Sequence, residues 1–255
     1  MLLTLDIGNS QTAFGCFEGE KLVGSWSLQT RAARASDEYA AFLLPLLAHA
    51  GLAGSRWNGV AVASVVPAAN HAVERFARDY LGVEPFHVRH DVELGCRLAP
   101  ENPGEVGADR LANAAYAARW LSLPCVVIDI GTATTLDVID ADRVYRGGAI
   151  LPGPRLAMDA LGQYTAKLPV AGLELPARGI GRNTLEAIRA GVLLGGAAAV
   201  NGLVARMTRE LGGPVEVALT GGFSSLFREA LDMPVRWLPS LTLEGIALVY
   251  RLNSR

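Results

Sequence analysis

The chain has 255 residues, of which 51% are hydrophobic and 19% charged, and a mean hydropathy of +0.27. This composition supports a packed core and excludes a disordered chain, and the length suggests one or two domains at roughly 150 residues each. The 23 Lys and Arg are balanced by 25 Asp and Glu, for a net charge of -2. Because the basic excess typical of nucleic-acid binding is missing, we expect no nucleic-acid partner.

The sequence offers no clear membrane or export signal. The longest uncharged stretches, at 39–55 and 190–205, are both shorter than the ~20 apolar residues that span a bilayer. The start, MLLTLDIGNS, has no basic leader and is expected to form a buried strand. Three cysteines without CxxC spacing argue against a disulfide framework and a structural zinc site. We therefore expect a cytoplasmic protein without a membrane partner.

Common nucleotide and metal motifs are missing. Both lysines, Lys21 and Lys167, are followed by leucine, so the GK[ST] element of a Walker A loop cannot exist. The segment 179–184 lacks the third glycine of a dinucleotide-binding GxGxxG turn. His87 and His90 would point to opposite faces of a strand, so we expect solvated histidines there rather than metal ligands.

An internal repeat organises the chain. The segment LDIGNS at 5–10 is matched by IDIGTA at 128–133, which lies 123 positions later, about half the chain length. The same register aligns Thr12 with Thr135 and Gly24 with Gly147. The repeat predicts two similar domains, 1–121 and 122–255.

Hydrophobic patterns and turn residues predict alternating strands and helices. In the first half we predict strands at 2–8, 12–19, 21–29, 59–66 and 85–89, and helices at 36–50, from 67, and at about 110–121. In the second half we predict strands at 125–131, 134–141, 143–151 and 215–223, and helices at 155–163, about 182–211 and 241–253. This order indicates an α/β fold of two duplicated domains, with helices covering the sheets and a ligand cleft at the strand ends between the copies.

The repeated motif carries the first candidate chemistry. Asp6 ends a buried strand and Gly8 follows in a turn, where backbone N–H groups can approach a phosphate. A single Asp-x-Gly is more often a plain hairpin turn, but the same pair recurs as Asp129 and Gly131, followed by hydroxyls at Thr132, Thr134 and Thr135. Two facing turns of this kind suit a polyphosphate and its cation. Hard cations such as Mg²⁺ and K⁺ take oxygen ligands, and each aspartate could serve one ion.

A third carboxylate, Asp109, lies beside Arg110 where a polar, turn-rich loop meets a predicted helix. Asp109 could be a helix N-cap, or it could orient or deprotonate an acceptor hydroxyl in phosphoryl transfer. The glycine turn at 220–222 suits close approach by a nucleoside or phosphate, or is a tight strand-to-helix turn. The small residues at 191–199 indicate close helix packing, for which the core of the subunit is the preferred location.

Taken together, the motifs resemble those of the type III pantothenate kinases, within the superfamily of acetate and sugar kinases, Hsp70 and actin, over essentially the whole chain. The motifs are DIGNS at 6–10, SVVP at 64–67, PGEVGADR at 103–110, DIGTATTLD at 129–137, GGAILPG at 147–153, GRNTLEAI at 181–188 and TGG at 220–222. The resemblance implies two ribonuclease-H-like domains and a homodimer. It also implies ATP-dependent phosphorylation of pantothenate to 4'-phosphopantothenate, the first step of coenzyme A synthesis.

The resemblance also implies roles for individual residues. The ATP-binding residues would be Asp6, Ile7, Gly8, Asn9, Ser10, Gln11, Thr12, Ala13 and Thr132. The pantothenate-binding residues would be Gly107, Ala108, Asp109, Arg110 and Thr184, with Asp109 as the proton acceptor. Asp129 would hold a monovalent cation, K⁺ or NH₄⁺, and Asp6 would contact the Mg²⁺ of ATP through water. Pro100 stands where many family members carry a tyrosine expected to contact pantothenate.

Two alternatives stay open. One is a non-catalytic relative of the same fold, since the family includes proteins named as accessory factors for transcription. The other is a kinase for another small hydroxylated or carboxylic acid substrate. The intact Asp109 and both Asp-x-Gly turns argue against the first, and the PGEVGADR loop at 103–110 argues against the second.

Overall fold

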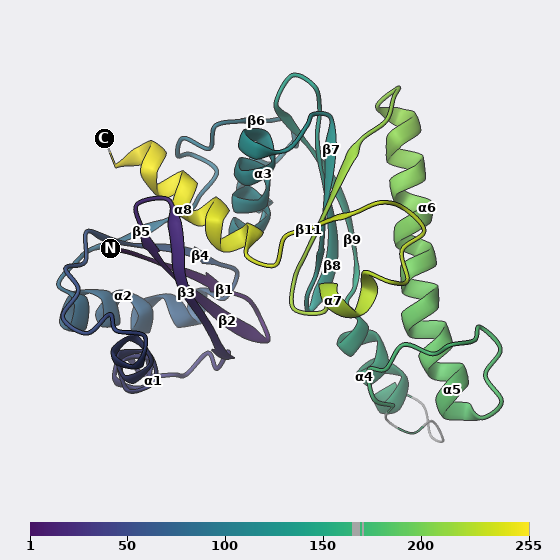
Figure 1. The fold of residues 1–255 in the computed structure, drawn as a ribbon, viewed down its shortest axis with the longest axis horizontal. Coiled ribbons are helices and arrows are strands. Elements are labelled where there is room, and N and C mark those ends of the chain that lie inside the picture. The colour runs from purple at the N-terminus through teal and green to yellow at the C-terminus, as the bar shows by residue number, and fades with distance from the viewer. Residues whose placement is uncertain (165–168, 170, 255) are drawn as a thin grey trace. The chain divides into compact units, whose positions relative to one another are not determined.

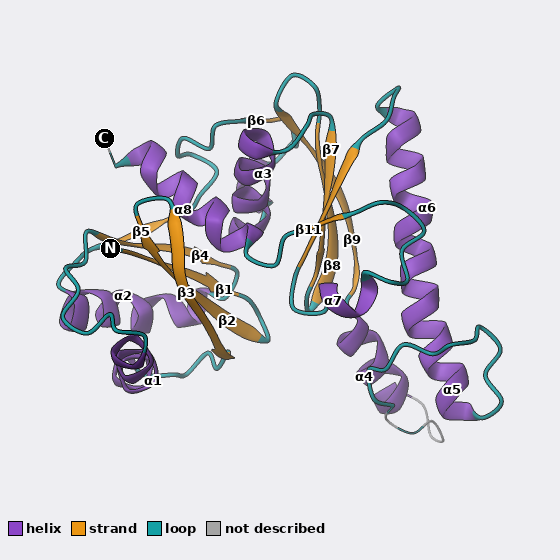
Figure 2. Ribbon diagram, viewed as in Figure 1, coloured by secondary structure: helices purple, strands orange, loops and turns teal. Residues whose placement is uncertain are grey.

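The computed structural model describes residues 1–164, 169 and 171–254 (Figure 1). The chain forms two compact units. Unit 1 consists of Met1–Cys96, Glu101–Arg119 and Leu241–Arg255, and unit 2 of Arg97–Pro100 and Trp120–Ser240. Each unit combines one sheet with several helices, so the α/β class is confirmed (Figure 2).

Unit 1 contains a five-stranded sheet in the order β3-β2-β1-β4-β5. Its first three strands form an antiparallel meander, and β4 and β5 continue the sheet in parallel with β1. The strands are β1 (Leu2–Ile7), β2 (Gln11–Glu18), β3 (Lys21–Gln29), β4 (Gly59–Ser64) and β5 (Pro85–His87). The helices are α1 (Ser36–His49), α2 (Pro67–Leu81), the 3-10 turn η1 (Pro103–Glu105), α3 (Ala108–Trp120) and α8 (Leu241–Asn253).

Helices cover both faces of the unit 1 sheet (Figure 1). On one face, α1 and α2 bury Tyr39 and Phe76 against Leu5 and Phe14 of the sheet. On the other, α8 packs against β1, β2 and β4. A Cβ on Gly245 of α8 would overlap the backbone of Ala112, so α8 also approaches α3 closely. The last helix therefore belongs to unit 1, which differs from the consecutive segments 1–121 and 122–255 expected from the repeat.

Unit 2 contains a six-stranded sheet in the order β11-β10-β7-β8-β9-β6. The strands are β6 (Arg97–Leu98), β7 (Cys125–Ile130), β8 (Ala133–Ile139), β9 (Val144–Pro152), β10 (Glu216–Thr220) and β11 (Arg236–Trp237). The helices are α4 (Pro154–Tyr164), α5 (Thr184–Arg189), the π-helical segment η2 (Ala190–Leu194), α6 (Gly195–Glu210) and α7 (Ser224–Phe227). The predicted strands and helices of both halves are thus present. The two-residue strands β6 and β11, the 3-10 turn η1 and the short helix α7 add to them, and the π segment η2 lies within the predicted helix at about 182–211.

One helical stretch, Thr184–Glu210, is long and apolar enough to cross a membrane by length and composition alone. It is longer than the uncharged segment at 190–205 because the helix continues at both ends. Core helices of globular proteins pass the same test, and here Leu193, Val200 and Val204 are buried in the core of unit 2. The stretch therefore packs as a core helix along one of its faces.

The two sheets share the same strand topology. The order β3-β2-β1-β4-β5 in unit 1 corresponds to β9-β8-β7-β10-β11 in unit 2, and β6 is an addition at the β9 edge. Even the irregularity of the third strand is repeated, because the pairing skips Val23 in β3 and Arg146 in β9. The duplication read from the sequence is therefore a duplication of structure.

The copies differ at the first hairpin turn. Ile7 pairs with Thr12, whereas Ile130 pairs with Thr134. The turn of unit 2 is one residue shorter, so Thr12 is structurally equivalent to Thr134. The sequence alignment of Thr12 with Thr135 is therefore wrong by one residue, because a constant offset of 123 cannot account for turns of different length.

Candidate active site

In unit 1, the parallel strands β1 and β4 end side by side. Asp6 lies beside Ala63 and Ile7 beside Ser64 in the ladder, and the Val65 N–H donates to the Ile7 carbonyl at 3.1 Å. Because the two strands run in the same direction, the turns that follow them meet at one edge of the sheet. The Asp6 carboxylate thus stands where a ligand-binding edge is expected in an open α/β sheet.

The turn after Asp6 is tight and open to solvent. The Gly8 N–H donates to the Gln11 carbonyl at 3.0 Å, and a Cβ on Gly8 would lie only 3.1 Å from that oxygen. Asn9, Ser10 and Gln11 are exposed. A side chain at position 8 would crowd the turn, so glycine keeps the backbone accessible to a phosphate.

The predicted ATP-binding segment thus divides into three parts: Asp6 and Ile7 end β1, Gly8 to Ser10 form the turn, and Gln11 to Ala13 begin β2. Two of its side chains serve the fold, since Ile7 is fully buried in the core and the Thr12 hydroxyl lies 2.8 Å from that of Thr30.

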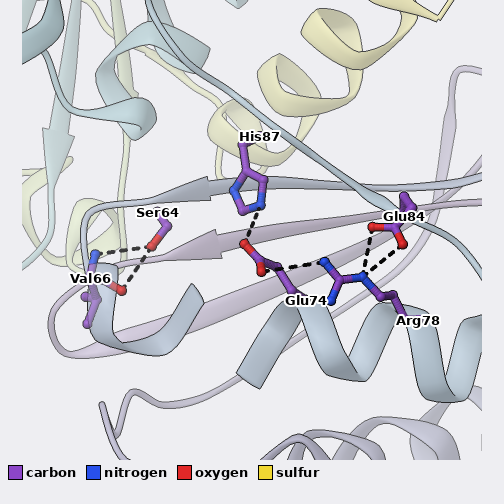
Figure 3. A network of polar contacts seen from close by, with 6 residues as sticks. All are labelled: Ser64, Val66, Glu74, Arg78, Glu84 and His87. Atoms are coloured by element: carbon purple, nitrogen blue, oxygen red, sulfur yellow. Dashed lines mark hydrogen bonds and ion pairs between the residues drawn. The ribbon is translucent and has the colours of Figure 1, made fainter. Parts of the chain in front are cut away.

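The SVVP motif forms the junction between β4 and α2 (Figure 3). The Ser64 hydroxyl accepts the Val66 N–H at 3.2 Å, and Pro67 occupies the first turn of α2, where its missing N–H costs nothing. Further along, His87 lies 3.3 Å from Glu74, which also contacts Arg78. His87 is therefore paired with a carboxylate rather than simply solvated.

Asp109 stands in the first turn of α3, after the 3-10 turn η1. Its Oδ1 accepts the Arg110 N–H at 2.8 Å. A Cβ on Gly107 would lie 2.5 Å from that same Oδ1 and 3.3 Å from the Val65 side chain. The glycine therefore leaves room beside the carboxylate, and the apolar side chain of Val65, from the SVVP segment, lies near the same space.

Burial raises the pKa of Asp109, against the Arg110 N–H and guanidinium, which lower it. A carboxylate whose pKa moves toward neutrality is a stronger proton acceptor than an ordinary surface aspartate. Asp109 therefore combines a raised pKa with a place in the first turn of a helix.

Thr184, the remaining residue of the predicted pantothenate set, lies in unit 2, whereas Gly107–Arg110 lie in unit 1. It is exposed at the start of α5. The preceding Asn183 caps this helix, since its side chain accepts the Glu186 N–H at 2.9 Å. The structure thus fixes Thr184 at a helix start, and neither unit contains the complete predicted set.

In unit 2, the parallel strands β7 and β10 end side by side, which places Asp129 beside Thr220. Gly221 follows with a φ of +97°. A Cβ on Gly221 would overlap Oδ1 of Asp129 and the backbone of Ile130. Similarly, a Cβ on Gly153 would overlap the carbonyl oxygens of Gly131 and Thr132. Gly153 and Gly221 thus allow other backbone segments to lie close to the repeated Asp-x-Gly turn. The sequence had given no role to Gly153.

The donor set around these turns suits hard cations. Asp129 and the neighbouring carbonyl and threonine groups offer oxygen only, as K⁺ and Mg²⁺ prefer. Within the described ranges, no group of three or more His, Cys, Asp or Glu side chains is placed to hold a metal. A single carboxylate such as Asp6 or Asp129 fits an ion that completes its shell with water and phosphate oxygens. The three cysteines are free thiols, as expected.

Solved structures with this architecture include a Baf family transcriptional activator from Campylobacter jejuni, with a TM-score of 0.64, 17% identity and coverage of 99% of this chain and 98% of that one. Another is the activator of 2-hydroxyisocaproyl-CoA dehydratase from Clostridium difficile with bound ADPNP, with a TM-score of 0.57, 15% identity and coverage of 99% and 94%. Together with the duplicated sheets, these similarities define the actin-like ATPase fold.

Sequence comparison is more specific than the fold. The family model for type III pantothenate kinase matches residues 2–206. The chain is 41% identical over 253 residues to the type III pantothenate kinase of Phenylobacterium zucineum, covering 99% of this chain and 98% of the relative. It is 39% identical to that of Acidiphilium cryptum, covering 99% and 95%. The chain belongs to the type III pantothenate kinase family.

Proposed function

We propose that this protein transfers the γ-phosphoryl group of ATP to the primary hydroxyl of pantothenate, yielding 4'-phosphopantothenate and ADP at the start of coenzyme A synthesis. The observation that carries the proposal is full-length similarity at about 40% identity to enzymes of that name, combined with an intact, partly buried carboxylate at Asp109.

In the proposed reaction, Asp109 accepts the proton of the substrate hydroxyl as its oxygen attacks the γ-phosphorus. The bond from phosphorus to the bridging oxygen breaks, and ADP leaves. The pantothenate contacts are Gly107, Ala108, Arg110 and Thr184. Phosphoryl transfer depends mainly on positioning and charge neutralisation, so this step asks the protein to hold both substrates in place and to set a proton acceptor beside the hydroxyl.

The segment Asp6–Ala13 holds the phosphates of ATP through the open turn at Gly8, and Thr132 provides a further ATP contact. Asp6 would hold Mg²⁺ through water, and the bound ion would supply charge neutralisation for the transferred phosphate. Asp129 would hold a monovalent cation, K⁺ or NH₄⁺. The support for both ions is the all-oxygen donor set and the glycines that keep backbone close to Asp129.

We further propose a cytoplasmic homodimer. The support is the family resemblance and the large apolar side chains that unit 2 exposes, among them Ile150, Tyr164 and Ile180. Light scattering on the purified protein measures the mass directly, and a monomer at micromolar concentration would contradict this part of the proposal.

The kinase is tested by coupled measurement of ADP release with ATP, Mg²⁺ and K⁺, with and without pantothenate, and by mass spectrometry of the product. We expect ADP release only with pantothenate, and phosphopantothenate as the product. ATP binding without release would indicate a non-catalytic relative. Release with another hydroxylated acid but not with pantothenate would indicate a different acceptor, and Pro100 would then be the first position to change to tyrosine.

A further inference from the structure

Unit 2 buries a carboxylate that the proposed reaction does not use. Asp137, in the middle of β8, has no exposed surface. Its Oδ1 accepts the hydroxyl of Tyr145 at 2.7 Å, and its Oδ2 accepts the hydroxyl of Thr135 at 3.3 Å. Burying a carboxylate is costly unless hydrogen bonds and charges compensate it. Such a group therefore needs an explanation beyond packing.

The duplication supplies an internal comparison. By ladder position, Asp137 corresponds to Gly15 of unit 1, because Asp137 pairs with Val127 and Gly15 with Thr4. In the same way, Thr135 corresponds to Ala13 and Tyr145 to Leu22. All three polar residues of unit 2 are thus replaced by groups without a polar side chain in unit 1.

In unit 1, the position that corresponds to Asp137 is filled by packed side chains without a polar network. A Cβ on Gly15 would lie 2.7 Å from the Thr4 hydroxyl and 3.3 Å from the Leu22 side chain, so no carboxylate could fit there. The same meander and the same bulge form nevertheless. The fold therefore does not require the Thr135–Asp137–Tyr145 network, and a function specific to unit 2 is the better explanation.

The bulge in β9 explains how Tyr145 reaches Asp137. The pairing with β8 skips Arg146, so Tyr145 pairs with Ile139. Ile139 and Asp137 lie two residues apart on one strand and thus share a face of the sheet. Bulges commonly re-aim a side chain in this way. Gly148 permits the close strand approach, since a Cβ there would overlap the Leu136 carbonyl.

The other end of the network leads to Asp129. Thr135 pairs directly with Asp129 across the antiparallel ladder. Opposite residues in such a ladder share a face, with Cβ atoms about 5 Å apart. A carboxylate without a proton can only accept hydrogen bonds, so the contact fixes the Thr135 proton toward Asp137. The lone pairs of the Thr135 oxygen are then directed away from Asp137.

We propose that Asp137 is a positioning residue for the monovalent cation: it orients the Thr135 hydroxyl so that its oxygen lone pairs complete the ion's shell beside Asp129. Tyr145 anchors Asp137 from the opposite side. This inference rests on the proposed cation site at Asp129. It assigns no proton transfer to Asp137, only the orientation of a neighbouring ligand.

The critical variant is Asp137→Asn. The Asn oxygen can still accept from Tyr145, and its amide group then donates to the Thr135 oxygen and occupies the lone pair that the ion needs. We expect the K⁺ concentration for half-maximal activation to rise by about tenfold or more. We expect Thr135→Val to do the same, and Thr135→Ser to retain the wild-type value because the hydroxyl remains.

The second readout does not require turnover. A ligand that binds only the folded state raises the melting temperature with its concentration. The melting temperature is therefore followed against K⁺ at constant ionic strength, with choline as the replacement ion. The wild type and Thr135→Ser should show the K⁺-dependent rise, whereas Asp137→Asn and Thr135→Val should show a flat response.

Thr4→Val is the matched control. It removes a buried hydroxyl that donates at 3.2 Å to the carbonyl of Gly15, the residue of unit 1 that corresponds to Asp137. We expect a lower melting temperature with an unchanged K⁺ dependence. If Asp137→Asn likewise lowers the melting temperature while both K⁺ curves match the wild type, the network is merely structural and the proposal is wrong.

A double variant tests whether Asp137 acts through Thr135. If Asp137 acts only through Thr135, adding Asp137→Asn to Thr135→Val should leave the half-activating K⁺ concentration at the value of Thr135→Val alone. If the fold-changes of the two substitutions multiply instead, Asp137 acts independently of Thr135 and the proposal is wrong. Should Asp137→Asn not fold, the comparison of Thr135→Val with Thr135→Ser tests the proposal. An equal K⁺ dependence of these two variants would contradict it. A wild type without K⁺ dependence in both readouts overturns the cation site and this proposal together, while pantothenate-dependent ADP release would leave the kinase intact.

Discussion

Gly221 lies so close to Asp129 that a single methyl group at position 221 would overlap the Oδ1 of that carboxylate. The contact follows from the ladder, which places Thr220 directly beside Asp129 at the ends of the parallel strands β10 and β7. Gly221 also has a φ of +97°, which residues with a side chain rarely adopt. The backbone of the glycine turn after β10 therefore packs directly against the Asp129 carboxylate and limits where that carboxylate can lie.

Gly221→Ala should displace the Asp129 carboxylate. We expect a fall in kcat of about tenfold or more, with strain of about 1–3 kcal/mol in the folded state. Gly202→Ala is the control, because Gly202 lies inside α6 with open space where its Cβ would be, and alanine there should stabilise the helix by about 1 kcal/mol. Steady-state kinetics and urea denaturation of both variants measure kcat and the free energy of unfolding. Wild-type activity of Gly221→Ala would show that Gly221 does not constrain the Asp129 carboxylate.

Pro45 should limit the stability of unit 1. It lies exposed inside α1, where it removes a backbone hydrogen bond, while the core contacts of that helix come from Leu43 and Leu47. We expect Pro45→Ala to raise the free energy of unfolding by about 2 kcal/mol, less than the ~3 kcal/mol cost of an interior proline because alanine frees the unfolded chain.

The control for this variant is Pro67→Ala. Pro67 is exposed at the start of α2, where proline is well tolerated, so its replacement should give no gain. Denaturant titration of both variants measures the difference. Equal effects of the two substitutions would mean that α1 relieves the interior proline in another way.

Much of the fold was predictable from the sequence because the signals are local. Alternating apolar residues and Gly, Asn or Asp turns mark the strands, and the repeat marks their order. The assignment of α8 was not predictable in this way. Its packing in unit 1 depends on contacts with β1, β2 and β4, far away in the sequence, and on the close approach of Gly245 to Ala112.

The candidate site was predictable to a similar degree. Asp6 and Asp129 were found because the duplication repeats them at strand ends. Asp137 ends the motif at 129–137 but received no role from the sequence. An aspartate inside a strand does not by itself reveal whether it is buried, and its contact with Tyr145 depends on a bulge at Arg146. The one-residue difference between the two hairpin turns likewise becomes visible only in the ladder.

The cysteines should be unreactive in the folded protein. Burial raises the pKa of Cys16 and Cys125 to about 12 and that of Cys96 to about 11, so little thiolate forms at neutral pH. We expect iodoacetamide to label none of them appreciably in native buffer and all of them in urea. Peptide mass spectrometry reads the sites, and rapid native labelling at Cys96 would show that the neighbouring backbone opens.

Asp109→Asn should separate catalysis from stability. If Asp109 accepts the substrate proton, its loss should reduce kcat by about 10²–10⁴-fold while ATP binding persists. In the wild type, the acid limb of kcat/KM should report a pKa above that of an ordinary aspartate, because burial raises the pKa of Asp109. Near-normal activity of the variant would return Asp109 to a purely structural role at the start of α3.

The effect of the same substitution on stability has the opposite sign. Because the pKa of Asp109 is raised on folding, its charged form is disfavoured in the native state, so ionisation destabilises the fold above that raised pKa. The penalty disappears as the pH falls below the unfolded pKa of about 3.9. We therefore expect Asp109→Asn to unfold at higher urea concentration than wild type at neutral pH, with the gap closing toward acid pH. A variant less stable than wild type at neutral pH would mean that the Arg110 contacts outweigh the cost of burial.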